Sequence, residues 1–318
     1  MEMLQTYAQK KAAMTIENLP IKPGTLRKRI RSATENARRS GKLHSIPTHS
    51  LVISDSGIDF LVRRVDSLAD KDWETRRALD QAGGQVENRQ NPFLPYDESM
   101  YVGHIGDNHV CLLNKFNVLD DHVLLVTRQF EHQDCLLSPD DFAALTFCLL
   151  EFDCLAFYNG GRIAGASQPH KHLQVVPLPF STQGPAVPLE PAIRQANWTA
   201  DLGRSEQIPF RHILGRPANP ITSQSGLEAA QMLHALYHRL LAESPAGVNQ
   251  SLGETKASPY NLLITRKWML LVPRTREFSG TISLNALAFA GALLVRSTDQ
   301  QQELTEKGCV AALKWVTE

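Results

Sequence analysis

The chain has 318 residues and carries 33 basic and 33 acidic side chains, so its formal charge is zero. A chain of this length can bury a sizeable core, arranged as one large domain or two smaller ones. The balanced charge argues against a dedicated nucleic-acid-binding protein, because such proteins are usually clearly basic.

The cysteines and the apolar segments predict a soluble cytoplasmic protein. Five scattered cysteines, none spaced as Cys-x-x-Cys, are Cys111, Cys135, Cys148, Cys154 and Cys309. An odd number without that spacing predicts reduced thiols, not a disulfide framework or a cysteine zinc site. Lys10, Lys11 and Glu17 interrupt any apolar signal region, and no apolar run is long enough for a membrane span. We therefore expect small-molecule partners, with no nucleic acid and no membrane.

A basic segment comes first along the chain. Between Lys22 and Lys42 the only acid is Glu35, and the basic residues there are Arg27, Lys28, Arg29, Arg31, Arg38 and Arg39. The simplest interpretation is a solvated helix face. A position near a substrate entrance and a basic targeting arm are the alternatives. Residues 57–64 then predict a strand, and residues 66–84 predict a helix with a polar face.

The middle of the chain predicts an antiparallel α+β unit. Residues 109–116 and 122–127 are two β-rich runs that predict a hairpin. Ser138, followed by a proline and two acids, predicts the start of a helix. Residues 154–158 predict a strand, and a second strand follows a glycine-rich loop. This order of hairpin, helix, strand, loop and strand is not that of alternating βαβ units.

The later part of the chain repeats some of this pattern. Residues 177–192 hold five prolines and a glycine, which predicts a connection and not a core element. Residues 225–241 predict a helix that begins with a capping box, and residues 260–265 and 268–272 predict two strands. Because the last two runs echo the hairpin of residues 109–127, the sequence suggests a weak internal duplication.

The strongest functional signal is residues 159–174, Asn-Gly-Gly-Arg-Ile-Ala-Gly-Ala-Ser-Gln-Pro-His-Lys-His-Leu-Gln. If the end of this run is a strand, His170, His172 and Gln174 share one face. The glycines before it would let a backbone turn its N–H groups toward an anion. A pair of core histidines, or the wet face of a half-buried strand, would explain part of this pattern. The whole combination favours transfer chemistry at phosphorus.

This motif resembles the histidine-triad superfamily of nucleotidyl transferases and hydrolases, and within it the diadenosine tetraphosphate phosphorylases, also called ATP adenylyltransferases. Gln174 stands at the third alternate position, as in the transferase branches, where the hydrolases carry histidine. The uridylyltransferase branch usually reads His-Pro-His-Gly-Gln, unlike this chain. Further similar segments are residues 91–96, 102–103, 109–118, 122–128, 260–266, 268–274 and 285–291.

The resemblance implies an α+β fold: a histidine-triad-like antiparallel sheet with flanking helices, made of two fused halves. The resemblance begins near residue 40, which leaves residues 1–40 as an N-terminal basic extension, and it implies a catalytic half over residues 41–180. Residues 181–318 would form the second half, which completes the sheet and the nucleotide pocket. Two halves in one chain would allow the protein to act as a monomer.

The resemblance also implies roles for single residues. His172 holds the position that becomes nucleotidylated in the family, so it is the expected nucleophile. His170 is expected to orient the site, and a zinc site shared with His172 is a weaker alternative because further ligands are lacking. The residues expected to bind nucleotide or phosphate are Asn114, Asn159, Gly165, Ala166, Ser167, Gln168, Gln174, Lys71 and Asn285. Of these, Gln174 would donate to a phosphate oxygen, and Asn114 would contact the ribose.

The implied reaction is phosphorolysis of diadenosine tetraphosphate to ATP and ADP, through a nucleotidyl-histidine intermediate in a ping-pong scheme. No covalently bound cofactor and no resident metal are expected, although a divalent cation such as magnesium would accompany the polyphosphate. One alternative is a related transferase or hydrolase acting on a sugar-1-phosphate uridylyl group or an adenylyl sulfate. Another is a non-enzymatic nucleotide sensor, against which the intact His172, Gln174 and Ser167 argue.

Overall fold

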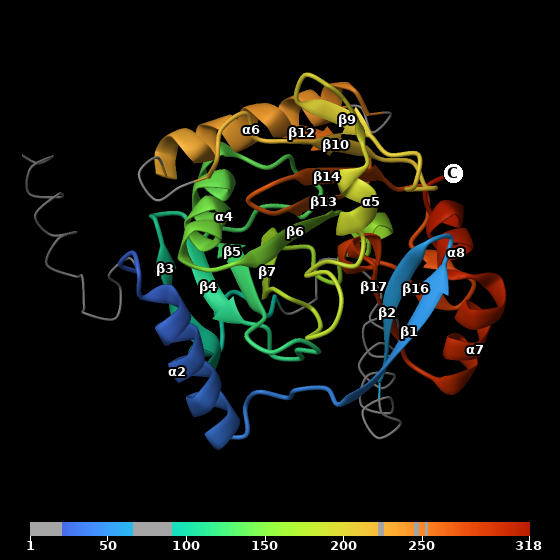
Figure 1. Ribbon diagram of the computed structural model, residues 1–318. Coiled ribbons are helices and arrows are strands. Elements are labelled where there is room, and N and C mark those ends of the chain that lie inside the picture. The colour runs from blue at the N-terminus through green and yellow to red at the C-terminus, as the bar shows by residue number, and fades with distance from the viewer. Residues whose placement is uncertain (1–20, 66–90, 222–225, 245–247, 252–253) are drawn as a thin grey trace, which may run out of the picture.

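A ten-stranded antiparallel sheet runs through the centre of the protein (Figure 1). The computed structural model describes residues 21–65, 91–221, 226–244, 248–251 and 254–318. The strand order is β3-β4-β5-β7-β6-β13-β14-β10-β9-β8, and the strands run antiparallel to their neighbours throughout. The predicted α+β class with an antiparallel sheet is confirmed.

The strands of this sheet form two sets with the same spatial order. The first set is β3 (Tyr101–Ile105), β4 (His109–Leu113), β5 (Val123–Thr127), β6 (Cys154–Gly160) and β7 (His172–Pro177). The second set is β8 (Asn197–Thr199), β9 (Leu202–Arg204), β10 (Ile213–Gly215), β13 (Tyr260–Ile264) and β14 (Met269–Pro273). The order 3-4-5-7-6 is thus repeated as 8-9-10-14-13, and α4 (Pro139–Glu151) and α6 (Gly226–Ala242) occupy the same place in each set.

The two sets meet at an approximate two-fold axis between β6 and β13. Phe157, the fourth residue of β6, pairs with Leu263, the fourth residue of β13. Equivalent residues therefore face each other, as they must next to a two-fold axis. The suspected duplication exists, but its predicted correspondence is wrong, because β13 and β14 correspond to β6 and β7 and not to the hairpin β4–β5. Two apolar runs separated by a short turn describe several strand pairs equally well, so the sequence echo was ambiguous.

Helices cover one face of the sheet. Helices α4 and α6 pack with Leu125, Leu173 and Ala156 of the sheet in one large apolar core. Figure 1 shows α6 running along one side of the sheet, with α2 (Leu26–Arg39) beside β3 and β4. The backbone N–H of Ile21 donates to the carbonyl of His104, so residues 21–39, which fall in the predicted basic extension, are docked on the first set.

A second core lies on the opposite face, mainly over the second set. It joins Phe157, Leu263 and Leu270 of the sheet to the C-terminal part of the chain. That part contains β17 (Ala292–Val295), α7 (Thr298–Lys307) and α8 (Cys309–Trp315). Strands β1 (Thr48–Asp55) and β2 (Ile58–Val65) join it in a separate sheet ordered β1-β2-β17. The proposed domain boundaries stay a prediction, and residues from both predicted halves pair in this small sheet.

The remaining elements are short. They are α5 (Glu190–Arg194), the strands β11 (Val248–Ser251), β12 (Glu254–Ala257), β15 (Phe278–Ser279) and β16 (Ile282–Ser283), and the 3₁₀ turns η3 (Glu98–Met100), η4 (Arg162–Ala164) and η6 (Ala286–Ala290). All five cysteines fall in the described ranges, and none of them forms a disulfide there. Within those ranges, no helix is long and apolar enough to cross a bilayer.

Several local predictions can be compared with the structure. Helix α4 begins at the predicted place, and Ser138 and Asp141 form a capping box there, because each accepts a hydrogen bond from the other's backbone N–H. The predicted strand at 57–64 is β2, and the predicted helix at 225–241 is α6, whose cap residue lies outside the described residues. The helix predicted at 66–84 also lies outside them. The loop predicted at 177–192 is wrong at its end, where α5 begins and Leu189 is buried, because proline is compatible with the first turn of a helix.

Candidate active site

The site lies at the start of β7, on the sheet face opposite α4 and α6. Leu173 and Val175 of β7 pack into the core beneath those helices, so alternation turns His172 and Gln174 to the other face. There Phe93 packs against four apolar side chains of β4 and β5, which are Val110, Leu112, Leu124 and Val126. The Phe93 ring lies 5.4 Å from the ring of His172 and therefore covers one side of the site.

His170 is not part of the strand, contrary to the predicted alternation. Strand β7 begins at His172, and His170 forms only an isolated bridge with His132. Its buried ring is held by the protein at both nitrogens. Nε2 donates to the Thr127 carbonyl at 2.8 Å, so Nδ1 is the acceptor for the Asn91 side-chain amide at 3.0 Å. The strand begins only after His170, and the His170 carbonyl lies against the side chain of His172.

The tautomer of His172 follows from that contact. Its Nδ1 lies 2.8 Å from the His170 carbonyl oxygen, which can only accept, so Nδ1 carries the proton. Nε2 then keeps its lone pair. Burial lowers the pKa of His172 to about 4, so the ring is neutral near pH 7. A neutral imidazole with a defined free nitrogen is what nucleophilic attack requires.

The backbone of His172 is clamped by the side chain of Gln133. Gln133 Oε1 accepts from the His172 N–H at 2.8 Å, and Gln133 Nε2 donates to the carbonyls of His172 and Asn159 at 3.1 and 2.9 Å. The pairing of β6 with β7 ends at Phe157 and Gln174, and in that register Asn159 would be the next partner of His172. The amide of Gln133 therefore bridges the backbones of β6 and β7 where the two strands separate, and it fixes the position of the His172 backbone.

Gln174 is oriented by a chain of unambiguous hydrogen bonds. Asn114 Oδ1 accepts from the Phe116 N–H, so Asn114 Nδ2 faces His122 Nδ1 at 3.2 Å and donates to it. His122 then carries its proton on Nε2 and donates it to Gln174 Oε1 at 3.0 Å. Burial lowers the pKa of His122 to about 4, so this tautomer persists at neutral pH. The amide nitrogen of Gln174 is left as a donor on the His172 face.

Asn159 is held from the second set of strands. Its Oδ1 accepts from Asn261 Nδ2 at 2.8 Å and from the Ala286 N–H at 2.9 Å. Its Nδ2 is buried and has no hydrogen-bond partner among the described residues. Asn285 lies nearby and caps η6 by accepting from the Leu287 N–H.

Gly165 and its neighbours form the loop beside this contact. Gly165 has a φ of +89°, and a Cβ there would lie 2.8 Å from the Leu284 carbonyl oxygen and 2.9 Å from Asn285 Cβ. Only glycine therefore lets this loop close against η6. Ser167 is exposed, while Ala166 and Gln168 are half-buried. The structure thus places Asn159 and Gly165 beside the segment of Asn285, and it connects Asn114 to Gln174 through His122. Lys71 lies outside the described residues.

Two family comparisons cover most of the chain. Residues 16–195 match the Ap4A phosphorylase N-terminal domain, where Ap4A is diadenosine tetraphosphate, and residues 206–317 match the ATP adenylyltransferase C-terminal domain. The chain belongs to the Ap4A phosphorylase family. The predicted resemblance is therefore confirmed.

Curated relatives and solved structures agree with this membership. The chain is 31% identical over 241 residues to diadenosine 5′,5′′′-P1,P4-tetraphosphate phosphorylase 2 of Saccharomyces cerevisiae, which covers 68% of this chain and 72% of the relative. It is 28% identical over 304 residues to the protein APA1 of the same yeast, covering 90% and 91% of the two chains. The crystal structure of yeast Ap4A phosphorylase Apa2 superposes with a TM-score of 0.72 and 26% identity, covering 92% of this chain and 97% of that one.

The candidate site of this family member contains residues that sequence reasoning missed. His122 was visible only as the first residue of a strand, and its bond to Gln174 depends on the pairing of β5 with β7. Gln133 lies in an irregular segment between β5 and α4 and had no sequence signal. Phe93 and Asn91 stood in a segment quoted only as similar to the family. The expected strand beginning at His122 was the available signal, but it did not give the register with β7 that places His122 beside Gln174.

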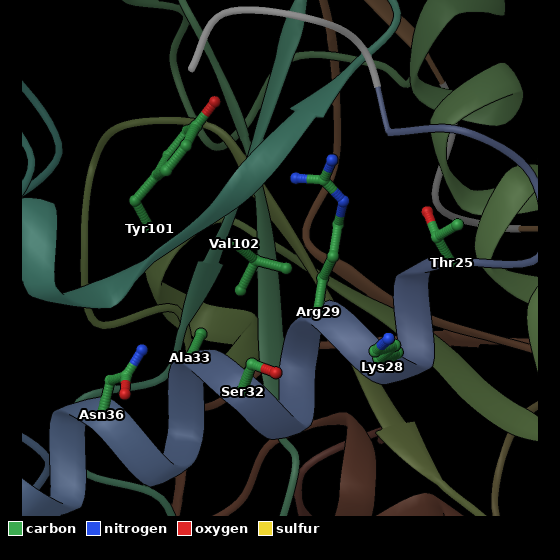
Figure 2. A pocket seen from close by; sticks show the side chains of 8 residues that line it. All are labelled: Thr25, Lys28, Arg29, Ser32, Ala33, Asn36, Tyr101 and Val102. Carbon is green, nitrogen blue, oxygen red and sulfur yellow. The ribbon is translucent and has the colours of Figure 1, made fainter. Parts of the chain in front are cut away.

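The basic segment forms the exposed face of α2, which is the simplest of the interpretations offered. Leu26, Ile30 and Ala37 are buried, while the arginine and lysine side chains of the helix are exposed. An open pocket of about 430 Å³ lies between α2 and β3, with Lys28 and Arg29 on the helix and Tyr101 on the strand (Figure 2). Among the described candidate site residues, none lines it.

Proposed function

We propose that this protein phosphorolyses diadenosine tetraphosphate to ATP and ADP. Membership of the Ap4A phosphorylase family supports the substrate, and a relative of known structure was crystallised with Ap4A and with AMP. The observation that carries the proposal for this chain is the Nδ1 contact of His172 with the His170 carbonyl, because it leaves Nε2 unprotonated on the sheet face opposite α4 and α6.

The first half-reaction is a displacement at the α-phosphorus. The lone pair of His172 Nε2 forms a bond to phosphorus, the bond from phosphorus to the bridging oxygen breaks, and ATP leaves. The ring becomes a cationic nucleotidyl-imidazole that keeps its Nδ1 proton. The His170 carbonyl, already hydrogen-bonded to that proton, stabilises the new charge.

The second half-reaction returns the histidine to its starting state. An oxygen of inorganic phosphate attacks the same phosphorus from the side that ATP vacated, the bond to Nε2 breaks, and ADP leaves. Because charge gathers on the non-bridging oxygens in both steps, fixed donors contribute more than acid–base groups. The amide of Gln174, held by His122, is one such donor. The loop with Gly165, Ala166, Ser167 and Gln168 would supply others.

Other features of the proposal rest on the chain's composition and architecture. We propose a cytoplasmic location, which five cysteines without a disulfide support, and a monomer, which the two sets of strands in one chain support. Magnesium would bind the polyphosphate and neutralise part of its charge. The ribose contact of Asn114 and the nucleotide contact of Asn285 remain predictions.

Product analysis tests the proposal. The purified protein is incubated with diadenosine tetraphosphate, with and without phosphate, and the nucleotides are separated. ATP and ADP should form only when phosphate is present, and His172→Ala should abolish the reaction. ATP and AMP formed without phosphate would identify a hydrolase and would contradict the role given to Gln174. The absence of any turnover would favour another nucleotide or a binding role.

A further inference from the structure

We infer that Asn261, in β13, and Arg274, which directly follows β14, are positioning residues that fix the direction of the Asn159 amide beside His172. The inference rests on the proposed function, since it assigns Asn159 a phosphate oxygen as its partner. It gives the second set a defined part in the reaction.

Arg274 is a buried cation that binds oxygens of the protein. The residue is only 4% exposed, and Nη1 donates to Asn261 Oδ1 at 2.6 Å and to the Leu284 carbonyl at 2.9 Å. Nη2 donates to the Arg276 carbonyl at 2.7 Å. Burial lowers the pKa of Arg274 to about 9, so the guanidinium still carries its charge at neutral pH. Burying a cation is costly, and here its donors tie together the end of β14, β13 and the segment before η6.

The guanidinium decides which way the Asn261 amide faces. Since Arg274 can only donate, Asn261 must present Oδ1 to it. Asn261 Nδ2 then donates to the Ala164 carbonyl and to Asn159 Oδ1, each at 2.8 Å. The Ala286 N–H donates to the same Asn159 oxygen. Two donors therefore hold Oδ1 of Asn159, and its amide nitrogen must point elsewhere.

Asn159 Nδ2 lies on the sheet face that carries His172 and Gln174. Phe157 pairs with Gln174, so in the same register Asn159 stands opposite His172 and shares its face. Asn159 Nδ2 is buried and unpartnered among the described residues, and a phosphate oxygen bound at His172 would satisfy it. Asn159 and Gln174 thus present one amide donor each, and each is oriented by a separate chain of hydrogen bonds.

The second set of strands has lost the nucleophile but keeps this role. When β7 and β14 are aligned at their last residues, Pro177 and Pro273, Trp268 takes the place of His172 and Leu270 takes that of Gln174. Both are buried in the second core. This set contributes to the site through Asn261 and through Arg274, which directly follows β14.

Two substitutions of Asn261 separate positioning from structural support. Asn261→Asp keeps the size and gives Arg274 a counter-charge, but a carboxylate cannot donate to Asn159 Oδ1. The Asn159 amide must then turn or shift. We expect kcat to fall on the order of 10²- to 10³-fold, as when one fixed oxyanion donor is removed, with a much smaller change in KM.

Asn261→Ala removes the donor and leaves a cavity, yet the Ala286 N–H still holds Asn159 Oδ1 in its present direction. We expect the Tm of this variant to be lower than that of Asn261→Asp. Its kcat should fall only roughly tenfold, which is a smaller loss than in Asn261→Asp. The order of the two variants in kcat is thus opposite to their order in Tm. Asn117, a buried asparagine that bonds Ser45 and Leu119, is the matched control, and Asn117→Asp should leave kcat nearly unchanged.

A titration with AMP adds a measurement that needs no turnover. Binding should weaken more in Asn261→Asp than in Asn261→Ala, because only the aspartate misdirects the donor. Wild-type kcat in the Asn261→Asp variant, or activity and AMP binding that simply follow Tm, would overturn the inference. Failure of the wild-type enzyme to use diadenosine tetraphosphate, with AMP binding in the predicted order, would instead count against the proposed function alone.

Discussion

His172 Nδ1 lies 2.8 Å from the carbonyl oxygen of His170, two positions earlier in the chain. In a continuous strand that carbonyl would point sideways to a neighbouring strand. Because the ladder starts only at His172, the carbonyl is available to the ring. The start of the strand at His172 therefore fixes the tautomer of the nucleophile. The partner of Nδ1 is a backbone carbonyl, so no other side chain is needed to hold the ring.

The first prediction concerns the pH dependence of the rate. His172 in the free enzyme has a pKa lowered by burial to about 4, so it stays a neutral nucleophile down to that pH. We expect kcat/KM to be flat between pH 7 and pH 5, provided that the assays have constant ionic strength. An imidazole of ordinary pKa, near 6.5, would lose most of its nucleophilic form over this range. An acid limb with its midpoint near 6.5 would therefore contradict the assignment.

The same burial predicts a pH-dependent stability. His122 and His172 take up protons near pH 6.5 in the unfolded chain but only near pH 4 in the folded protein. The unfolded state binds more protons in between, so the free energy of unfolding falls as the pH falls through this window. Each histidine contributes a slope of up to about 1.4 kcal/mol per pH unit. Urea unfolding of the wild type and of His172→Gln at pH 7 and pH 5 measures this change in the free energy of unfolding. An equal change in the two proteins would refute the contribution of His172.

Gln133 should matter for both folding and catalysis. Gln133→Leu keeps a similar volume but leaves the His172 N–H and two carbonyls without their partner. We expect a loss of stability of at least about 3 kcal/mol, since three groups lose their partner and each buried unsatisfied group costs about 1–3 kcal/mol. We also expect a fall in kcat of more than tenfold, because the nucleophile is displaced. Denaturant unfolding and initial rates test this, with exposed Gln183 as control in Gln183→Leu. Unchanged kcat in Gln133→Leu would show that the clamp is dispensable.

The sequence predicted the parts of the site that follow from local rules. Alternation placed His172 and Gln174 on one face, and the cap at Ser138 gave the start of α4. Both strands were expected, but their register could not be predicted. The bond of His122 to Gln174, which joins residues 52 positions apart, was therefore missed. The misassigned duplication has the same origin. Apolar runs identify strands, but only pairing identifies which strands are equivalent.

The rest of the site depends on contacts that no local pattern encodes. The Asn159 and Asn261 side chains meet across 102 positions, and they do so because β6 and β13 adjoin at the two-fold axis. Gln133 reaches His172 from a segment without regular structure. His170 shows the opposite error: the predicted alternation extends to residue 170, but the strand begins only at His172, and the His170 carbonyl bonds the His172 ring and not a neighbouring strand.

The chain of hydrogen bonds that ends at Gln174 gives a further prediction. Asn114→Leu removes the donor that holds His122 Nδ1, which allows the other tautomer and lets the Gln174 amide turn over. We expect kcat to fall roughly tenfold with little change in Tm, because the interaction is partly exposed and one hydrogen bond is worth about 1 kcal/mol. Asn36→Leu on the exposed face of α2 is the control. If Asn114 contacts the ribose instead, KM will rise while kcat stays constant.

The last prediction concerns the charged cluster behind the site. Lys171 points away from its histidine neighbours, and its Nζ lies 2.7 Å from Asp141 Oδ2, while His109 Nε2 lies 2.8 Å from Asp141 Oδ1. Burial raises the pKa of Asp141, whereas the hydrogen bond from His109 and the charge of Lys171 lower it. Together these effects give a pKa of about 2. Asp141→Ala leaves a buried cation without this partner and should cost about 3–5 kcal/mol. Because the cluster lies on the helix-covered face, kcat measured well below the lowered Tm should change less than threefold. A large loss of kcat in a folded Asp141→Ala protein would mean that the cluster acts on His172 through the strand.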